Sequence, residues 1–347
     1  MASVQFNLRL MYTPRVDKAV IAVKKLGFPW QTEDPFLFCV HHLDDYPAGN
    51  AELGPAASLS GRDMGQDFDP REEWRMYHGQ VVPGFPSHPH RGFETVTAVL
   101  KGLIDHSDSQ GSAGRYGNGD VQWLTAGAGI QHAEMFPLLN TEARNPLELF
   151  QIWLNLPAAR KFVSPYYSMV WAEDVPRFRK SSVEADIVAG TIDGIVALPP
   201  APDSWAADPA NELAIWVIRM QPHGSWKMPV ASPGVNRTLF FYRGSRVKID
   251  GAEIPAGHSV RLRPEHETAI EAGADECHLL LLQARPIGEP VYQYGPFVMN
   301  TQDEIVAAYN DYRRDQFGGW PWPRHDPVHP RSRGRFATFA DGREVVR

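Results

Sequence analysis

Two short segments of the chain carry pairs of potential metal ligands spaced two residues apart. His88 and His90 flank Pro89, and farther along the chain His132 and Glu134 flank Ala133. Alternate residues of a β-strand point to the same face, so both members of each pair project together if the segments are strands. Should the two strands be neighbours in one barrel, three imidazoles and one carboxylate would converge inside it. The spacing therefore predicts a transition-metal site with room for exogenous ligands.

The ligand types also indicate what such a site would favour. Three neutral imidazoles and one carboxylate would leave a divalent ion with a net positive charge, which favours an anionic oxygen ligand such as an enolate or phenolate. Imidazole and carboxylate ligands suit Fe, Mn, Ni, Cu and Zn, so the residues by themselves do not choose the metal.

Glu94 is a further carboxylate near the first pair. It lies four residues after His90 and on a continuous strand would share the inward face of His88 and His90. Two roles are open to it: a ligand in place of Glu134, or a second carboxylate that orients a ligating imidazole from behind.

The elements that must position these residues are short strands separated by glycine-rich turns. Strand-like runs cover residues 95–100, 120–124 and 147–154, and a second series of similar order covers residues 213–219, 238–243, 247–250, 259–262 and 278–282. In both series a strand ends with a basic residue and glycine, Lys101-Gly102 and Arg243-Gly244. This predicts an all-β protein built from a tandem duplication of one small antiparallel barrel.

The predicted architecture has three consecutive parts along the chain. Residues 1–157 are expected to form the first barrel, with a long loop or insertion at 47–79 that contains one helical turn near 71–74. Residues 158–298 are expected to form the second barrel, and residues 299–347 a helix and an irregular tail. The helix is predicted from a capping box at residues 301–304 and from the helical spacing of Ile305, Ala308, Tyr309 and Tyr312.

Composition limits the class of partner. The 347 residues, about two domains, carry a formal charge of -7, which argues against direct nucleic-acid binding. No apolar stretch is long enough to span a membrane, and no signal peptide is evident. The two cysteines, Cys39 and Cys277, are not in a Cys-x-x-Cys motif and suit a reducing compartment, so we expect a cytoplasmic protein.

Three motifs resemble those of the pirin family, within the cupin superfamily. The run HPHRGFETVT at residues 88–97 is similar to the family signature. Residues 119–127 together with 132–134 match its second motif, and GPFVMNT at residues 295–301 is also pirin-like. The resemblance extends, with gaps, from about residue 34 to residue 312.

This resemblance implies two cupin (jelly-roll) barrels, a bicupin, with metal only in the first. Pirins hold one metal ion, usually iron, by three histidines and one glutamate, which fall here on His88, His90, His132 and Glu134. The resemblance therefore favours one divalent ion, Fe(II), as the cofactor and leaves Glu94 behind the ligands. The insertion at 47–79 and the tail beyond Gly318 depart from the family pattern. The insertion is expected either to cap the barrel mouth or to mediate an oligomer contact.

Two functions of different class follow from the resemblance. The first is a dioxygenase of the quercetin 2,3-dioxygenase type, acting on a small aromatic or enolic substrate, with Glu134 as the catalytic base and Phe85, Phe93 and Trp123 as apolar walls. The second is an iron-dependent regulator that binds a protein partner, a transcription factor or a metabolic enzyme. Arg91, beside the ligands, would then belong to the partner-binding surface.

Overall fold

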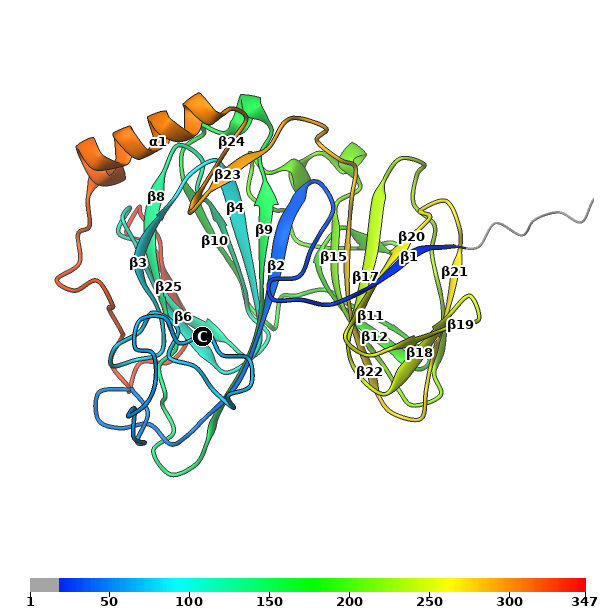
Figure 1. Cartoon of the computed structure of the whole chain (residues 1–347), viewed down its shortest axis with the longest axis horizontal. Helices are drawn as coiled ribbons and strands as arrows, with labels where there is room; N and C mark the ends of the chain where they lie inside the picture. Colours follow the sequence, from blue (N-terminus) through cyan, green and yellow to red (C-terminus); the bar gives the residue numbers. More distant parts are fainter. Residues whose placement is uncertain (1–18) are drawn as a thin grey trace, which may run out of the picture.

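The first barrel, which includes residues 84–135, forms the left half of the molecule in Figure 1. The computed structural model describes residues 19–347, and here it shows two antiparallel sheets, a five-stranded one in the order β10-β7-β4-β9-β2 and a six-stranded one in the order β26-β25-β6-β5-β8-β3. Their strands are β2 (Phe36–Tyr46), β3 (Gly84–His90), β4 (Phe93–Lys101), β5 (Leu103–Asp108), β6 (Ala113–Gly117), β7 (Val121–Thr125), β8 (Ile130–Met135), β9 (Asn145–Asn155), β10 (Tyr166–Val170), β25 (Phe336–Thr338) and β26 (Glu344–Val346).

The second barrel repeats this construction with a seven-stranded sheet, β1-β20-β17-β22-β15-β12-β11, and a four-stranded sheet, β16-β21-β18-β19. Its strands are β1 (Val20–Lys25), β11 (Arg177–Lys180), β12 (Val183–Ala189), β15 (Ala214–Met220), β16 (Ser225–Met228), β17 (Asn236–Arg243), β18 (Arg246–Ile249), β19 (Ala252–Pro255), β20 (His258–Leu262), β21 (Thr268–Ala272) and β22 (Cys277–Ala284). Two hairpins stand apart: β13 (Thr191–Ile192) with β14 (Ile195–Val196), and β23 (Tyr292–Tyr294) with β24 (Phe297–Met299). The predicted all-β, two-barrel architecture is confirmed.

The two barrels share a detail of strand irregularity. The pairing of β4 with β9 shifts register between Val99 and Lys101, and that of β17 with β22 shifts between Phe241 and Arg243. Each shift lies just before the basic residue and glycine that end the strand. The repeated β-bulge supports the predicted duplication and aligns β4 with β17.

The barrels pack through the five-stranded and seven-stranded sheets. One apolar cluster joins Phe150 and Ile152 of the first barrel to Phe240 and Leu280 of the second, all four inaccessible to solvent. Trp30 stacks on Phe240, with ring centroids 5.3 Å apart. Burial of these faces excludes water from a continuous core and is the main force joining the barrels.

The chain crosses between the barrels more often than the predicted boundaries allow. Strand β1, from the predicted first domain, pairs with β20 of the second barrel. Strand β10, which follows residue 157, pairs with β7 of the first barrel. A division of the chain at residue 157 therefore does not separate the strands of the two barrels.

The C-terminal region contains more regular structure than expected. Helix α1 (Gln302–Asp315) begins with the predicted capping box, in which Thr301 and Glu304 bond each other's backbone N–H. The tail, predicted to be irregular, contributes β25 to the edge of the six-stranded sheet, where it pairs with β6. Four short 3₁₀ helices occur in the described part of the chain, at Ala158–Arg160, Trp205–Ala207, Pro209–Asn211 and, directly after α1, Gln316–Gly318. No helix of residues 19–347 is long and apolar enough to cross a membrane.

The insertion at 47–79 is ordered by buried polar contacts. The helical turn predicted near 71–74 is absent, and turns and bends occupy that position. The carboxylate of Asp44 accepts hydrogen bonds from Arg75 Nε (2.8 Å) and the Tyr77 hydroxyl (2.8 Å). The insertion is thereby tied to β2, and Tyr77 lies against Phe85, just before the first histidine pair on β3.

Candidate metal centre

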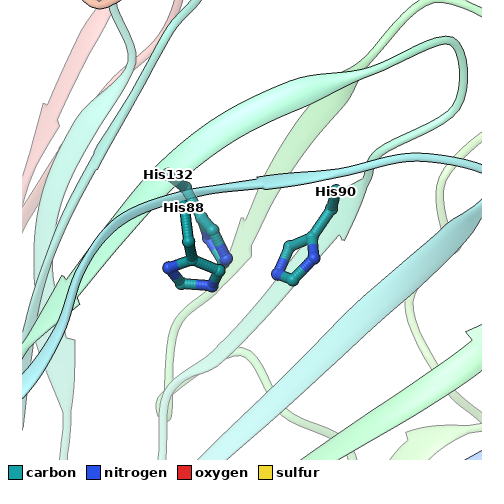
Figure 2. A group of neighbouring side chains, drawn as sticks. All are labelled: His88, His90 and His132. Carbon is teal, nitrogen blue, oxygen red and sulfur yellow. The ribbon is translucent and has the colours of Figure 1, made fainter. Parts of the chain in front are cut away.

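The three predicted histidines meet inside the first barrel (Figure 2). Strands β3 and β8 are neighbours in the six-stranded sheet, and their register places His88 opposite His132. One nitrogen from each of His88, His90 and His132 lies within 4.8 Å of the other two. Around one metal ion, imidazole nitrogens bound at about 2.1 Å lie at most about 4 Å apart, so small side-chain adjustments suffice.

The environment of these imidazoles suits metal ligands. His90 and His132 are buried, whereas His88 retains some exposure. Burial lowers the pKa of His88 to about 4 and holds the pKa of His90 and His132 well below the usual range, so all three are neutral, the form that binds metal. His88 Nδ1 lies 2.9 Å from the Pro86 carbonyl oxygen and must carry the proton, which leaves Nε2 free as a ligand.

His132 gives the strongest indication that a cation belongs here. Both of its ring nitrogens are buried without a hydrogen-bond partner in residues 19–347, as is His90 Nδ1. Such atoms cost free energy unless something satisfies them. A metal ion would satisfy one nitrogen of each ring, so the residues present fit the group that the fold implies.

Glu134 stands beside the histidines but outside the group that meets within 4.8 Å. Its Oε2 lies 3.9 Å from His132 Nε2 and accepts a 2.6 Å hydrogen bond from Gln151 Nε2. Burial raises the pKa of its carboxyl. The side chain is therefore near enough to ligate after a small movement, or to exchange a proton with a group bound at the histidines.

Glu94 does not lie where strand alternation predicted. Its oxygens accept hydrogen bonds from the Thr125 hydroxyl (2.7 Å) and the Ser204 hydroxyl (2.5 Å), and it forms no hydrogen bond with a histidine among the described residues. Val96 and Ala98, on the same side of β4, lie in the core between the barrels. The prediction that Glu94 shares the face of His88 and His90, as a ligand or behind one, is wrong.

A glycine explains this reversal. Between β3 and β4 the chain bends at Gly92, whose φ is +86° and where a Cβ would lie 2.0 Å from the Val298 carbonyl oxygen. Only glycine meets both requirements. The two strands belong to different sheets, so alternation does not continue from one to the other.

Aromatic rings contact the ligand imidazoles, as expected for two of the three predicted walls. Phe93 lies edge-on to His90 with centroids 5.0 Å apart, and Phe85 lies 6.3 Å from His88. Trp123 was expected to join them, but it lies in the core between the barrels. Its place is taken by Trp153, whose ring lies 5.0 Å from His90 and stacks on Phe93.

Comparison with known proteins places the chain in a family. A model described as Pirin matches residues 56–154, and one described as Pirin C-terminal cupin domain matches residues 215–318. Human Pirin is 32% identical over 268 residues, covering 74% of this chain and 86% of Pirin. The chain belongs to the pirin family.

Other relatives of this pirin carry enzyme names. A Pseudomonas aeruginosa protein named "Putative quercetin 2,3-dioxygenase" is 38% identical over 239 residues, covering 67% of this chain and 79% of its own. The crystal structure of a quercetin 2,3-dioxygenase from Acinetobacter baumannii is similar with a TM-score of 0.68 and 25% identity, covering 87% of this chain and 99% of that one. The bicupin fold is shared with this structure.

Three residues of this pirin's site were missed from the sequence. Gln151 holds Glu134, Trp153 lies against His90, and His106 lies on β5 opposite Glu134 in register. Gln151 offered a signal, because it is the one polar residue in the run from Leu149 to Leu154. His106 and Trp153 are residue types that protein cores often contain, so nothing in the sequence marked them as part of the site.

Arg91 is not the exposed surface residue that the regulatory hypothesis required. Its side chain is buried, with Nε donating to the Ala128 carbonyl oxygen (2.6 Å) and Nη1 to Asp311 of α1 (2.7 Å). The guanidinium also lies 4.4 Å from the centre of the Phe317 ring. In this pirin the C-terminal helix covers the arginine.

Proposed function

We propose that this pirin is a metal-dependent dioxygenase of the quercetin 2,3-dioxygenase type, with Fe(II) as its metal. The substrate would be a flavonol or a related small enolic compound. The proposal rests on one observation: three neutral imidazoles converge inside the barrel, and the Glu134 carboxylate lies next to this group without belonging to it. The names of the relatives support the same class of reaction.

Each side chain has a role in this proposal. His88, His90 and His132 would hold the ion, with Glu134 as the fourth ligand or, when released from it, as the base that takes the hydroxyl proton of the substrate. The bound ion would supply a Lewis acid that favours the ionised hydroxyl and a site for reaction with O2. Gln151 fixes the carboxylate of Glu134, and Phe85, Phe93 and Trp153 offer aromatic surface to a planar substrate.

A regulatory role through a protein partner is the second candidate, and the insertion favours it. Phe68, Tyr77 and His78 all pack on Phe85, with ring centroids 6.2, 5.2 and 5.5 Å away. Phe85 in turn lies beside His88, so we infer that this aromatic cover narrows the approach to the histidines. A narrow mouth suits a smaller enolic substrate or a metal site that is sensed and not used in turnover.

The deciding experiment is anaerobic reconstitution with Fe(II) followed by addition of quercetin and O2. We expect stoichiometric iron and a metal-dependent loss of flavonol absorbance that is coupled to O2 uptake. His90→Ala should lose both iron and turnover while keeping its fold, since the barrel core is untouched. His223→Asn, at an exposed histidine with a left-handed backbone that asparagine tolerates, is the matched control.

Two outcomes would contradict parts of this proposal. Stoichiometric iron in His90→Ala would overturn the ligand assignment. Bound iron without turnover of quercetin would overturn the flavonol substrate and direct the search to smaller enolic substrates and to protein partners captured with iron-loaded protein.

A further inference from the structure

The second barrel contains a cavity of its own, far from the histidines in sequence. It has a volume of about 510 Å³ and lies where strands β12, β15, β17 and β22 begin or end. Its floor includes Trp216 of β15, Arg237 of β17 and Gln283 of β22, and Val196, Leu198 and Val230 contribute apolar wall.

Arg237 is an unusual residue for such a position. It is 1% exposed, lies on the inward face of β17 with Leu239 and Phe241, and donates one hydrogen bond, from Nε to Gln283 Oε1 (2.7 Å). Its Nη1 is buried without a partner among the described residues. A buried guanidinium with an unpaired N–H group lowers stability unless an acceptor forms the missing hydrogen bond.

No carboxylate of the described chain neutralises this charge at close range. Glu212, whose field reaches Arg237, instead accepts from the Ser232 backbone N–H (3.0 Å) and lies 3.8 Å from Arg285. Burial lowers the pKa of Arg237 to about 10, so the guanidinium is still charged at neutral pH.

Trp216 adds a second unsatisfied donor to the same cavity. Trp216 is 2% exposed, and its Nε1 is buried with no hydrogen-bond partner in the part of the chain that the structure describes. Indole and guanidinium N–H groups can only donate, so the group that completes both must be an acceptor. Next to a charged arginine, an anionic oxygen is the favoured acceptor.

The position of Arg237 corresponds to the functional end of the first barrel. The matching bulges align Arg237 with Thr95, each six residues before the basic residue that ends its strand. Thr95 pairs with Trp153, the ring that lies against His90. The duplicated barrels thus place histidines at this end in one copy and a lone arginine in the other.

We propose that the second barrel binds a small monocarboxylate with an apolar body, held through Arg237 and Trp216. Arg237 is the only cationic side chain among the residues that line the cavity, and the aliphatic wall suits an apolar body. Three carboxylates also line it: Asp193 lies 3.3 Å from Lys180, Asp208 accepts from the Ala210 backbone N–H (2.9 Å), and Glu212 accepts from the Ser232 backbone N–H (3.0 Å). Their negative charge disfavours a dianion such as phosphate or a dicarboxylate.

Calorimetric titration of the full-length protein with benzoate tests this proposal, with benzamide as the neutral probe of the same shape. We expect saturable benzoate binding, with benzamide at least about tenfold weaker. Arg237→Met should weaken benzoate binding by at least about tenfold, and Trp216→Phe by several-fold. Arg246→Met, at a mostly exposed arginine of the same barrel, should leave it unchanged.

Benzoate could also bind a metal ion, so the titration is repeated with His90→Ala, in which binding should persist. Absence of saturable binding by the parent protein, unchanged binding in Arg237→Met, or loss in His90→Ala would each overturn the proposal. Should Arg237→Met fail to fold, Trp216→Phe and the contrast between benzoate and benzamide decide it. None of these readouts depends on oxygenase activity, so the proposal stands or fails separately from the proposed function.

Discussion

At the scale of single residues, the first barrel concentrates groups that are costly to bury without a partner. His132 has two unpartnered ring nitrogens, and Glu134 is a buried carboxylate satisfied mainly by Gln151. A core built only for stability would avoid such groups, because apolar residues of the same size cost less. Their presence at one point indicates that a ligand completes them.

Glu134→Gln tests the role of that carboxylate. The substitution keeps the shape but removes the charge and the basic oxygen, so we expect oxygenase turnover to fall by about 10²–10⁴-fold with little change in the fold. Oxygen uptake and bound iron measured on the same sample separate a lost base from a lost ligand. Full turnover in this variant would exclude Glu134 as the catalytic base.

The buried carboxyl of Glu94 should make the stability of the protein depend on pH. Burial raises the pKa of its carboxyl from 4.5 to about 7, so the folded state binds a proton more tightly than the unfolded state. The resulting stabilisation is complete below about pH 4.5 and is lost as the pH rises through about 7, a change of ~3 kcal/mol. Relative to Glu94→Gln, the parent protein should therefore lose stability over this range, as measured by urea unfolding at several pH values. Parallel stability curves for the two proteins would contradict the shifted pKa.

At the scale of elements, the C-terminal tail covers a sheet edge and supplies hydrogen-bond acceptors to a buried guanidinium. Arg115 pairs with Asp105 inside the barrel, with Nε to Oδ1 at 2.7 Å, and donates to the carbonyl oxygens of His329, Pro330 and Arg333. Strand β25 covers the β6 edge. Hydrogen bonds to a charged group are among the stronger ones, so the tail is part of the first barrel's structure.

Deletion of residues 320–347 should therefore destabilise the protein. It removes three acceptors from a buried guanidinium and exposes the β6 edge, so we expect a loss of at least about 3 kcal/mol and a tendency to aggregate. Deletion of residues 340–347 alone, which removes β26 but keeps the acceptors and β25, is the control and should cost clearly less, because the buried guanidinium keeps its acceptors. Thermal unfolding and light scattering measure both effects, and equal stability of the two deletions would refute this role of the tail.

At the scale of the whole molecule, the two barrels behave as one structure because their larger sheets bury each other. The apolar cluster between them draws on both sheets and on Trp30, which precedes β2. Strands β1 and β10 also cross from one half of the chain to the other barrel. Neither barrel could be separated without exposing an apolar face and breaking a sheet.

Phe240→Ala tests this coupling. The ring is fully buried at the interface, so its removal should cost about 3–5 kcal/mol and lower the temperature of a single calorimetric transition for the whole protein. Phe162→Ala, at a ring that is 59% exposed, is the control and should cost less than about 1 kcal/mol. Two separate transitions, with only one shifted, would show that the barrels unfold independently.

Features that depend on local spacing could be predicted from the sequence alone. The two histidine-containing pairs, the capping box at Thr301 and the repeated strand endings all follow from neighbours along the chain, and the structure contains each of them. The tertiary structure decided what depends on which sheet a strand joins and what covers it. The bend at Gly92 turned Glu94 away from the histidines, α1 buried Arg91, and the fold of the second barrel left Arg237 Nη1 without an acceptor among the described residues. Strand alternation is a local rule that ends where the chain passes from one sheet to another, and burial is a property of contacts between segments far apart in the sequence.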